Sequence, residues 1–398
     1  MNCKITNTKI TPFMSFGKMP IANGFINKKN FKKEYFYKME VGFSKKISLV
    51  QLINHPKPKQ MFNKNYPFFT SSSKEMIVHF KKYSNWIKKK FSKKIVNLVE
   101  IGSNDGTFLS NFKNTNVNVL GIEPSSNVAK ISSKKGINTI NKFFNFNNIK
   151  KLNKLKKNVD VICGANVICH IPDLKSLIKG VDYLLAKKGV FIFEEPYLGS
   201  MYKKTSYDQI YDEHIYLFSV SSIKKIFEIF GFDLIDALPQ KTHGGSMRYV
   251  IGKKNENKIS KNVKKILKKE RQNNIDNIKG CLKFKQNCEK SKHNLINKLN
   301  LIKSKGKKIA GYAATSKSTT VLNYCKIGPK LIDFICDTTK NKIGKFSPGT
   351  HIPIKSMNYF YKNIPDVAYL FAWNHRNEIF KKEKKLKNKI KWISHVKI

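Results

Sequence analysis

Short runs of β-branched and aromatic residues alternate with amphipathic stretches between residues 94 and 254, and this alternation constrains the fold more than any other feature. Such runs are typical of parallel strands that are buried on both faces, with helices crossing between them. The last two runs are joined by a short turn, which predicts an antiparallel hairpin. The runs expected as strands are 94–102, 117–124, 137–144, 159–168, 189–196, 232–239 and 246–252, with a helix over 176–189.

The residues on either side of this region have a different pattern. The whole chain, at 398 residues, is too long for one ordinary core. Residues 1–72 show little periodicity, which predicts a small irregular lobe. From 255 to 305 apolar residues recur every three or four positions, which predicts two long helices with basic outer faces. The recurring residues are Ile259, Val263, Ile266, Ile275, Ile278, Leu282, Leu295, Leu299 and Ile302. A second strand–loop–helix unit begins at 307. We therefore expect three domains, 1–72, 73–254 and 255–398.

The composition limits the partners and the compartment. The net charge of +51 suggests a nucleic-acid partner, but the lysines are spread over the whole chain and do not form a stripe interleaved with aromatic residues. We expect neither a nucleic acid nor a membrane as partner, and a monomer or weak homodimer. The sequence contains no apolar run long enough to span a membrane, and its N-terminus does not resemble a signal peptide, so we expect a cytoplasmic protein.

The seven cysteines do not indicate a disulfide framework. Their number is odd, no CxxC pair occurs, and most of them stand in apolar runs, as free buried thiols do in a reducing compartment. We expect no metal site in this chain.

The loop VEIGSNDGTFL, at the end of the first strand, carries glycines that let the backbone approach a ligand near a helix N-terminus. The spacing differs from the GxGxxG of dinucleotide sites. Asn104 and Asp105 would repel a pyrophosphate but suit the amino and carboxylate ends of S-adenosylmethionine. Glu123, after the second strand, can accept both hydroxyls of a ribose. The cofactor-binding residues expected are Glu100, Gly102, Ser103, Asn104, Asp105, Gly106, Glu123, Pro124 and Asn166.

Groups that can transfer protons are expected at the same edge of the sheet. Asn166 and His170 follow the fourth strand, where ligands bind in open α/β folds. The stretch IYDEH, with Tyr211, Glu213 and His214, comes soon after the fifth strand. These side chains are therefore expected to meet where a methyl donor would lie.

With these motifs in order along nearly the whole chain, the sequence resembles the nucleotide-sugar C-methyltransferases, which methylate a carbon of a 4-keto deoxysugar carried on a nucleoside diphosphate. The matching stretches are MPIANGF, YPFFTSSS, VEIGSNDGTFL, ANVICHIPDL, FEEPYL, YDQIYDEHIYLFS, HGGSMRYV, GYAATSKSTTVLNY and KIGKFSPGTHIPI. The resemblance implies a class I methyltransferase sheet of seven Rossmann-like strands, a small N-terminal lobe and a second Rossmann-like C-terminal domain.

The resemblance also implies roles for individual residues. His214 would remove a proton next to the ketone, and Glu213 would orient its ring. Tyr211, Tyr66 and His170 would donate hydrogen bonds to the developing enolate oxygen. The substrate-binding residues implied are His243 and Arg248 on the closing hairpin and Gly311, Lys317 and Asp337 in the C-terminal domain.

Two features of the sequence depart from the family pattern. Relatives carry four zinc-binding cysteines in the N-terminal lobe, whereas only Cys3 occurs in the first 100 residues here, so we do not expect zinc. Ala313 stands where relatives commonly have a glycine.

Two other classes of protein remain open from the sequence. One is an NAD-dependent nucleotide-sugar reductase or epimerase, although GxGxxG is missing, and the other is a basic nucleic-acid-binding protein. The sequence does not indicate which sugar, nucleotide or ring carbon is involved.

Overall fold

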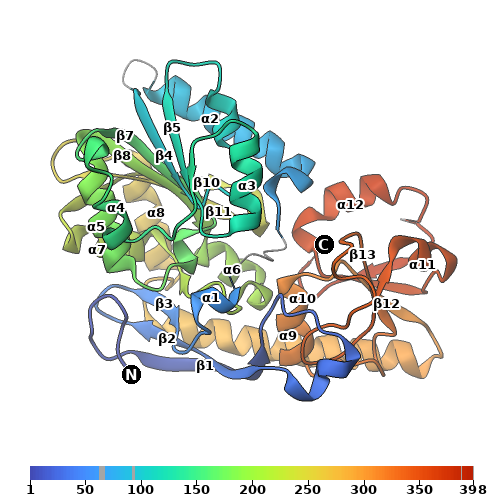
Figure 1. The fold of residues 1–398 in the computed structure, drawn as a ribbon. Helices are drawn as coiled ribbons and strands as arrows, with labels where there is room; N and C mark the ends of the chain where they lie inside the picture. The colour runs from blue at the N-terminus through green and yellow to red at the C-terminus, as the bar shows by residue number, and fades with distance from the viewer. Residues whose placement is uncertain (62–67, 92–94, 387, 398) are drawn as a thin grey trace.

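The computed structural model describes residues 1–61, 68–91, 95–386 and 388–397, and it contains three β-sheets (Figure 1). A seven-stranded sheet forms the central domain, a five-stranded sheet forms the C-terminal domain, and a four-stranded sheet forms most of the N-terminal lobe. No helix among the described residues is long and apolar enough to cross a membrane.

The central sheet has the strand order β10-β11-β8-β7-β4-β5-β6. All neighbours are parallel except β11, which is antiparallel to both β8 and β10. This arrangement confirms the predicted fold class and its closing hairpin. The strands are β4 (Asn97–Ile101), β5 (Asn118–Ile122), β6 (Thr139–Ile140), β7 (Val159–Ala165), β8 (Leu185–Pro196), β10 (Phe232–Gln240) and β11 (Ser246–Lys253).

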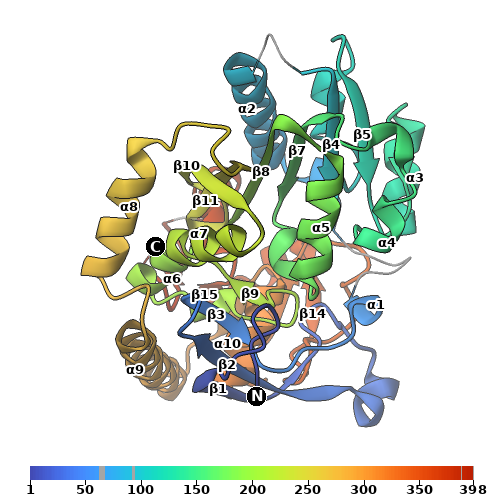
Figure 2. The same ribbon diagram turned by 90° about the vertical axis from the view of Figure 1, so that its left-hand side faces the viewer.

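Helices cover both faces of this sheet because successive side chains of a strand point to opposite faces. Leu98 packs with the helix α2 (Lys74–Phe91), whereas Val99 belongs to a separate core on the face covered by α5 (Leu174–Leu184) and α7 (Val220–Ile229) (Figure 2). Of two shorter helices, α3 (Ser126–Lys134) packs beside β6 and α4 (Phe146–Ile149) packs against α5. The helix expected over 176–189 ends at Leu184, because Leu185 already pairs with Val159 as the first residue of β8.

The N-terminal lobe is not irregular, so that expectation was wrong. It contains β1 (Thr11–Pro20), β2 (Phe36–Ser44) and β3 (Leu49–Leu52), all antiparallel, and β9 (Tyr216–Leu217) from the central domain completes the sheet. Two irregularities in the pairing of β1 interrupt its alternation of buried and exposed residues. A bulge shifts side chains to the opposite face, so the period of two is hidden in the sequence.

The C-terminal domain is a parallel sheet with helices beside it, as predicted. Its strands, in the order β14-β13-β12-β15-β16, are β12 (Ile309–Tyr312), β13 (Phe334–Asp337), β14 (Ile354–Ser356), β15 (Val367–Leu370) and β16 (Lys391–Ile393). Its helices are α10 (Ser316–Tyr324), α11 (Met357–Lys362) and α12 (Arg376–Lys382).

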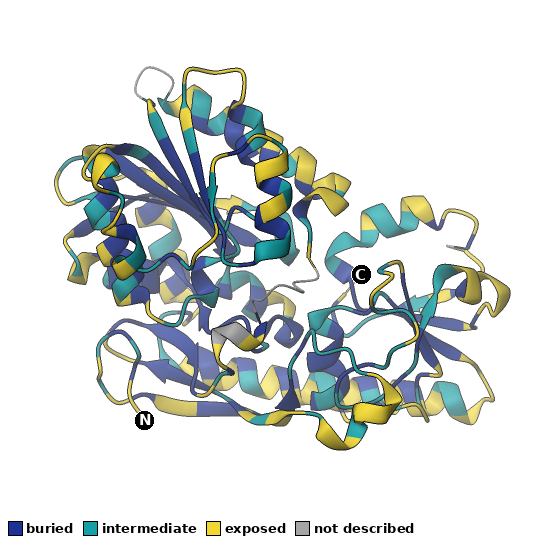
Figure 3. Cartoon of the chain, in the orientation of Figure 1, coloured by how far each residue is buried: buried dark blue, intermediate teal, exposed yellow. Residues whose placement is uncertain are grey.

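Two long helices, α8 (Lys261–Gln272) and α9 (Ile278–Ser304), connect the central and C-terminal domains. Helix α9 packs beside β1 along the base of the molecule (Figure 1). Its outer surface is exposed and its inner surface is buried (Figure 3). Leu282, expected on the apolar face, is 47% exposed, and Cys281, Phe284 and Cys288 form that face instead. All seven cysteines are buried and free.

Glu270 of α8 fixes this helix to the central domain. Its carboxylate is fully buried and accepts bonds from the backbone N–H groups of Val220 and Ser221, which begin α7, and from the hydroxyls of Ser221 and Tyr197. A negative charge at a helix N-terminus is stabilising, and here it also satisfies donors that the helix leaves unpaired.

We expect Glu270→Ala to lower the free energy of unfolding by about 2–4 kcal/mol, because four donors lose their buried acceptor. Urea unfolding followed by tryptophan fluorescence measures this. Glu228→Ala is the matched control, since Glu228 lies on α7 itself but is 44% exposed and pairs with Lys224 of the same helix. Its expected effect is below about 0.5 kcal/mol. Equal effects of the two changes would contradict the anchoring role of Glu270.

Candidate active site

A cavity of about 610 Å³ lies beyond the carboxyl ends of β4, β5, β7 and β8. Ligands bind at this edge in open α/β sheets, where the chain crosses to either side of the first strand. The central domain, the N-terminal lobe and the C-terminal domain all contribute to its wall. The expected site residues that line it are Glu100, Gly102, Ser103, Asn104, Glu123, Pro124, Asn166, His170, Tyr211, Glu213, His214 and His243.

The turn after β4 brings two strand ends into close contact. Gly102 has a φ of +68°, and a Cβ on it would lie 2.6 Å from a methyl carbon of Val167, which follows β7. Only glycine fits there. Gly106, also expected to bind the cofactor, does not line the cavity. A Cβ at Gly106 would instead meet the hydroxyl of Ser132 on α3 at 2.6 Å, so this glycine allows the turn to pack against the helix.

Acidic and polar atoms without partners face the cavity from this turn. Within the described residues, Glu100 Oε2, Ser103 Oγ and Asn166 Oδ1 are buried and have no hydrogen-bond partner. Burial, with nearby Glu123 and Asp105, raises the pKa of Glu100 well above its usual range. Unpaired buried acceptors are costly unless a ligand completes them. Ammonium and hydroxyl groups of S-adenosylmethionine are suitable donors, so the residues present fit this cofactor.

Glu123 is held in place by two backbone bonds. Its carboxylate accepts the N–H of Asn104 at 3.0 Å and that of Ser125 at 2.7 Å. Burial raises its pKa. Each carboxylate oxygen keeps a further lone pair, which leaves Glu123 able to accept ribose hydroxyls as expected.

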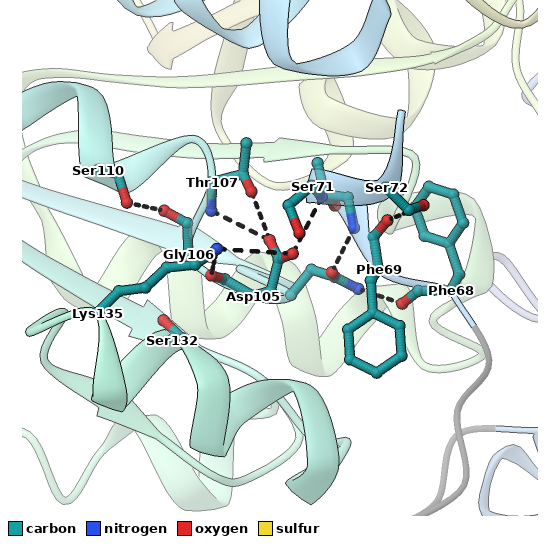
Figure 4. A network of polar contacts seen from close by, with 12 residues as sticks. Phe68, Phe69, Ser71, Ser72, Asp105, Gly106, Thr107, Ser110, Ser132 and Lys135 are labelled. Carbon is teal, nitrogen blue, oxygen red and sulfur yellow. Dashed lines mark hydrogen bonds and ion pairs between the residues drawn. The ribbon is translucent and has the colours of Figure 1, made fainter. Parts of the chain in front are cut away.

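Asp105 does not face the cavity, which corrects the expectation that it binds the cofactor. Its buried carboxylate accepts the backbone N–H of Ser71 at 3.0 Å and the hydroxyl of Thr107 at 2.6 Å, and Lys135 lies 3.7 Å away (Figure 4). Although burial acts in the opposite direction, these partners lower its pKa. Asp105 therefore fastens the segment 68–72 to the glycine turn.

Asn104 completes the same fastening. Its side-chain oxygen accepts the N–H of Thr70 at 3.0 Å, and its amide donates to the carbonyl of Phe68 at 3.2 Å. Phe68, Thr70 and Ser72 line the cavity. The polar loop thus positions a second wall of the cofactor site.

His214 is anchored by its Nδ1 atom. Nδ1 lies 2.6 Å from the carbonyl oxygen of Gln209, and because a carbonyl only accepts, Nδ1 carries the proton. Nε2 then accepts from the hydroxyl of Tyr211 at 2.7 Å. Burial, reinforced by the neighbouring His170, lowers the pKa of His214 well below its usual range. The imidazole is neutral at neutral pH, with its basic nitrogen on the side of Tyr211.

His170 and Glu213 lie beside this pair. The rings of His170 and His214 are stacked at 5.3 Å, and burial lowers the pKa of His170 to about 4. Glu213 does not orient His214, which corrects its predicted role. Its carboxylate accepts the side-chain amide of Asn23 at 2.8 Å, and burial raises its pKa.

His243 reaches the cavity from the turn between β10 and β11. Its Nε2 accepts the amide of Asn166 at 2.9 Å, and burial lowers its pKa to about 3. A Cβ on the next residue, Gly244, would lie 2.2 Å from the ring of Trp373, so the HGG turn packs tightly against the C-terminal domain.

Arg248 lies in the core and not in the cavity, so its predicted contact with a diphosphate is not supported. Its guanidinium pairs with buried Glu194 at 2.6 Å and stacks over the rings of Tyr83 and Trp86. Turning toward a ligand would leave Glu194 without this partner, at a cost of about 3–5 kcal/mol.

Gly311 and Asp337 also lie outside the cavity wall. A Cβ on Gly311 would meet the ring of Phe371 at 2.6 Å, so this glycine serves packing within the sheet. Asp337 accepts the backbone N–H groups of Ala314 and Thr339, both at 2.7 Å. It therefore shapes the loop after β12 and does not face the ligand.

Lys342 supplies the cavity with a cation. It was not among the site residues predicted from the sequence. Its Nζ donates to the carbonyl of Ala314 at 2.7 Å and lies 4.8 Å from the ring centre of Phe25. The predicted cation, Lys317, does not line the cavity, because its Nζ bonds Asn374 at 3.0 Å over the ring of Trp373.

The other cavity residues not predicted include Asn23, Thr315, Ser316 and Thr339. The motifs that resemble the family contain Lys342, Asn23, Thr315 and Ser316, which was the available signal. Tyr66 lies outside the described residues.

The ligands for zinc are missing from the N-terminal lobe. Cys3 and His55 are the only cysteine and histidine in residues 1–62. Cys3 is 2% exposed and packs in an apolar cluster with Ile5, Ile10 and Leu49. The described groups of side chains close enough to share an ion lie elsewhere. A tetrahedral zinc site does not fit this lobe, and apolar packing stabilises it instead.

We expect Asp105→Asn to weaken the binding of S-adenosylmethionine about tenfold, because an amide has one acceptor oxygen where the carboxylate has two, so either the N–H of Ser71 or that of Thr107 loses its acceptor and the cavity wall loosens. Isothermal titration measures the affinity. Asp160→Asn is the matched control, since Asp160 accepts the N–H groups of Val96 and Asn97 at the opposite end of β4. Unchanged affinity in the Asp105 variant would contradict the fastening role.

Three family models match consecutive parts of the chain. A putative zinc binding domain matches residues 3–62, a methyltransferase domain matches 60–237, and a C-methyltransferase C-terminal domain matches 241–396. C-methyltransferase NovU of Streptomyces niveus is 29% identical over 374 residues, which are 93% of this chain and 89% of the relative.

Solved structures with similar folds include two methyltransferases. Magnesium protoporphyrin IX methyltransferase (ChlM) from Synechocystis with bound SAM has 12% identity and a TM-score of 0.33, and covers 44% of this chain and 78% of its own. An S-adenosylmethionine-dependent methyltransferase from Clostridium acetobutylicum has 16% identity and a TM-score of 0.36, and covers 44% and 92%.

The family matches decide between the enzyme classes left open by the sequence, because they assign the central sheet to methyl transfer and not to NAD chemistry. The chain is an S-adenosylmethionine-dependent methyltransferase, and its three parts are similar, in the same order, to a putative zinc binding domain, a methyltransferase domain and a C-methyltransferase C-terminal domain.

Proposed function

We propose that this protein methylates a ring carbon of a 4-keto sugar carried on a nucleoside diphosphate. The observation that carries the proposal is that one cavity joins the glycine turn and Glu123 to the Tyr211–His214 pair and to Lys342. The cofactor site, a proton acceptor and a cation for an anionic group thus share one cavity.

His214 is suited to removing the proton next to the ketone. The imidazole is neutral, and its anchored Nδ1 directs Nε2 toward Tyr211. A ketone oxygen in the cavity gives the hydroxyl of Tyr211 a new acceptor. When that hydroxyl turns to the ketone, Nε2 is free to take the proton, and the same hydroxyl stabilises the enolate oxygen.

The cofactor, held by the glycine turn and Glu123, would supply a methyl group on a sulfonium for transfer to the enolate carbon. The buried side chains around this carbon lower the local dielectric and so strengthen the hydrogen bond to the enolate. His170 and Glu213 lie beside His214 in the cavity wall and can donate further hydrogen bonds. Burial disfavours the protonated form of His214. This promotes loss of the proton from His214 after each turnover.

The nucleotide half of the substrate is assigned to the C-terminal domain. Lys342 provides the charge, and the hydroxyl residues Thr315, Ser316 and Thr339 lie in the same wall. Burial lowers the pKa of Lys342, while nearby Asp337 favours its charged form. A diphosphate would stabilise that charged form further.

We expect His214→Asn to abolish methyl transfer while the affinity for S-adenosylmethionine changes less than about threefold, because the proton acceptor is lost but the glycine turn is intact. Mass spectrometry of 4-keto nucleotide sugars incubated with enzyme and cofactor detects the gain of one methylene. His293→Asn, on the exposed side of α9, is the control and should behave as wild type. Full turnover by the His214 variant would contradict the proposal.

We expect Lys342→Met to raise the KM for the nucleotide sugar at least about tenfold and to change kcat less, because Lys342 binds the diphosphate and not the reacting carbon. Steady-state kinetics at saturating cofactor measure both constants. Lys340→Met removes an exposed lysine two residues away and should leave KM unchanged. An unchanged KM in the Lys342 variant would place the diphosphate elsewhere.

A further inference from the structure

The loop that carries His214 is hydrogen-bonded to the C-terminal domain. We propose that Asp208 is a positioning residue, which Trp373 and His395 hold in place so that the carbonyl of the adjacent Gln209 keeps His214 in its Nδ1-protonated form. The inference rests on the proposed role of His214 as the proton acceptor.

Asp208 is buried and bonded on both carboxylate oxygens. It lies in the short 3-10 helix Tyr207–Gln209. The indole N–H of Trp373 donates to Oδ2 at 2.7 Å, and His395 Nε2 donates to Oδ1 at 3.1 Å. The side chains of Asp208 and His395 are 0% exposed. A buried carboxylate held at both oxygens has little freedom to move, and it fixes the backbone that carries it.

His395 is itself fixed in one orientation. Its backbone N–H donates to the hydroxyl of Tyr369 at 3.1 Å, and that hydroxyl is 2.8 Å from His395 Nδ1. Nε2 lies 3.1 Å from a carboxylate oxygen of Asp208, and because a carboxylate only accepts, Nε2 carries a proton that faces Asp208. The ring also packs at 4.7 Å against that of Tyr207, the residue before Asp208.

The backbone next to Asp208 meets both His214 and the C-terminal domain. The carbonyl of Gln209 accepts from His214 Nδ1 at 2.6 Å, and the carbonyl of Ile210 accepts the hydroxyl of Thr320, on α10, at 2.9 Å. A loop fixed on both sides of Gln209 presents its carbonyl in one direction. That direction decides which nitrogen of His214 carries the proton.

Asp208, Trp373 and His395 are absent from the cavity wall. Loss of their contacts should therefore change the reactivity of His214 and leave the binding of cofactor and substrate almost unchanged. A side chain needed only for folding would affect stability and all binding constants together. This difference separates positioning from general structural support.

The experiment compares Asp208→Asn, His395→Phe and His395→Gln. Asparagine has one acceptor oxygen where Asp208 has two, phenylalanine keeps ring volume but has no donor, and glutamine keeps an amide donor. Nitrogen NMR of histidine-labelled protein reports the proton position on His214, and the resonance is assigned by its loss in His214→Asn. Titration with S-adenosylmethionine and kcat for the nucleotide sugar complete the readouts.

In wild type we expect His214 protonated on Nδ1. In Asp208→Asn and His395→Phe we expect a mixture of the two tautomers, with kcat lowered at least about tenfold and cofactor affinity within about twofold. His395→Gln should recover most of the wild-type tautomer and kcat. An unchanged tautomer in a folded Asp208→Asn or His395→Phe protein would overturn the proposal, as would equal losses in both His395 variants.

The tautomer readout does not depend on the substrate. If no 4-keto nucleotide sugar is methylated, the proposed function fails, but the NMR comparison still decides whether Asp208 positions His214. If Asp208→Asn does not fold, the two His395 variants give the answer. Phenylalanine removes the donor that His395 offers to Asp208, and glutamine keeps a donor there.

Discussion

The hydrogen bond from His214 Nδ1 to the carbonyl of Gln209 is the interaction on which the account of the site depends. A buried, neutral histidine can act as a base only through the nitrogen without a proton. By fixing the proton on Nδ1, this bond leaves Nε2 as the basic nitrogen, which lies 2.7 Å from the hydroxyl of Tyr211. Glu213 was expected to do this, but a carbonyl orients the ring without adding a charge that would raise its pKa.

The site requires all three parts of the chain. The central domain supplies the glycine turn, Glu123 and His214, whereas Asn23 comes from the N-terminal lobe and Lys342 from the C-terminal domain. The N-terminal lobe pairs its strand β3 with β9, which begins two residues after His214. Apolar packing around Cys3 stabilises this lobe, and through the pairing of β3 with β9 the lobe supports the segment that carries His214.

Local patterns predicted the elements of the fold but not the partners of buried charges. The strands of the central sheet follow from apolar runs, and the clustering of His170, Tyr211 and His214 follows from the edge at which parallel strands end. Arg248 was expected to bind a diphosphate because a local pattern does not reveal its partner Glu194, which is 54 positions away in the sequence. Asp105 was misplaced for the same reason, since Ser71 lies on a preceding segment. The strand β1 was missed because its bulges hide its alternation.

Hydrogen exchange at the substrate carbon tests the central claim most directly, because it isolates proton removal from methyl transfer. A 4-keto nucleotide sugar is incubated in deuterated water with enzyme and S-adenosylhomocysteine, which cannot donate a methyl group. The account predicts deuterium at one carbon beside the ketone with the wild-type enzyme, and only the uncatalysed rate when His214 is replaced by asparagine. Equal, enzyme-dependent exchange by both proteins would show that another group removes the proton.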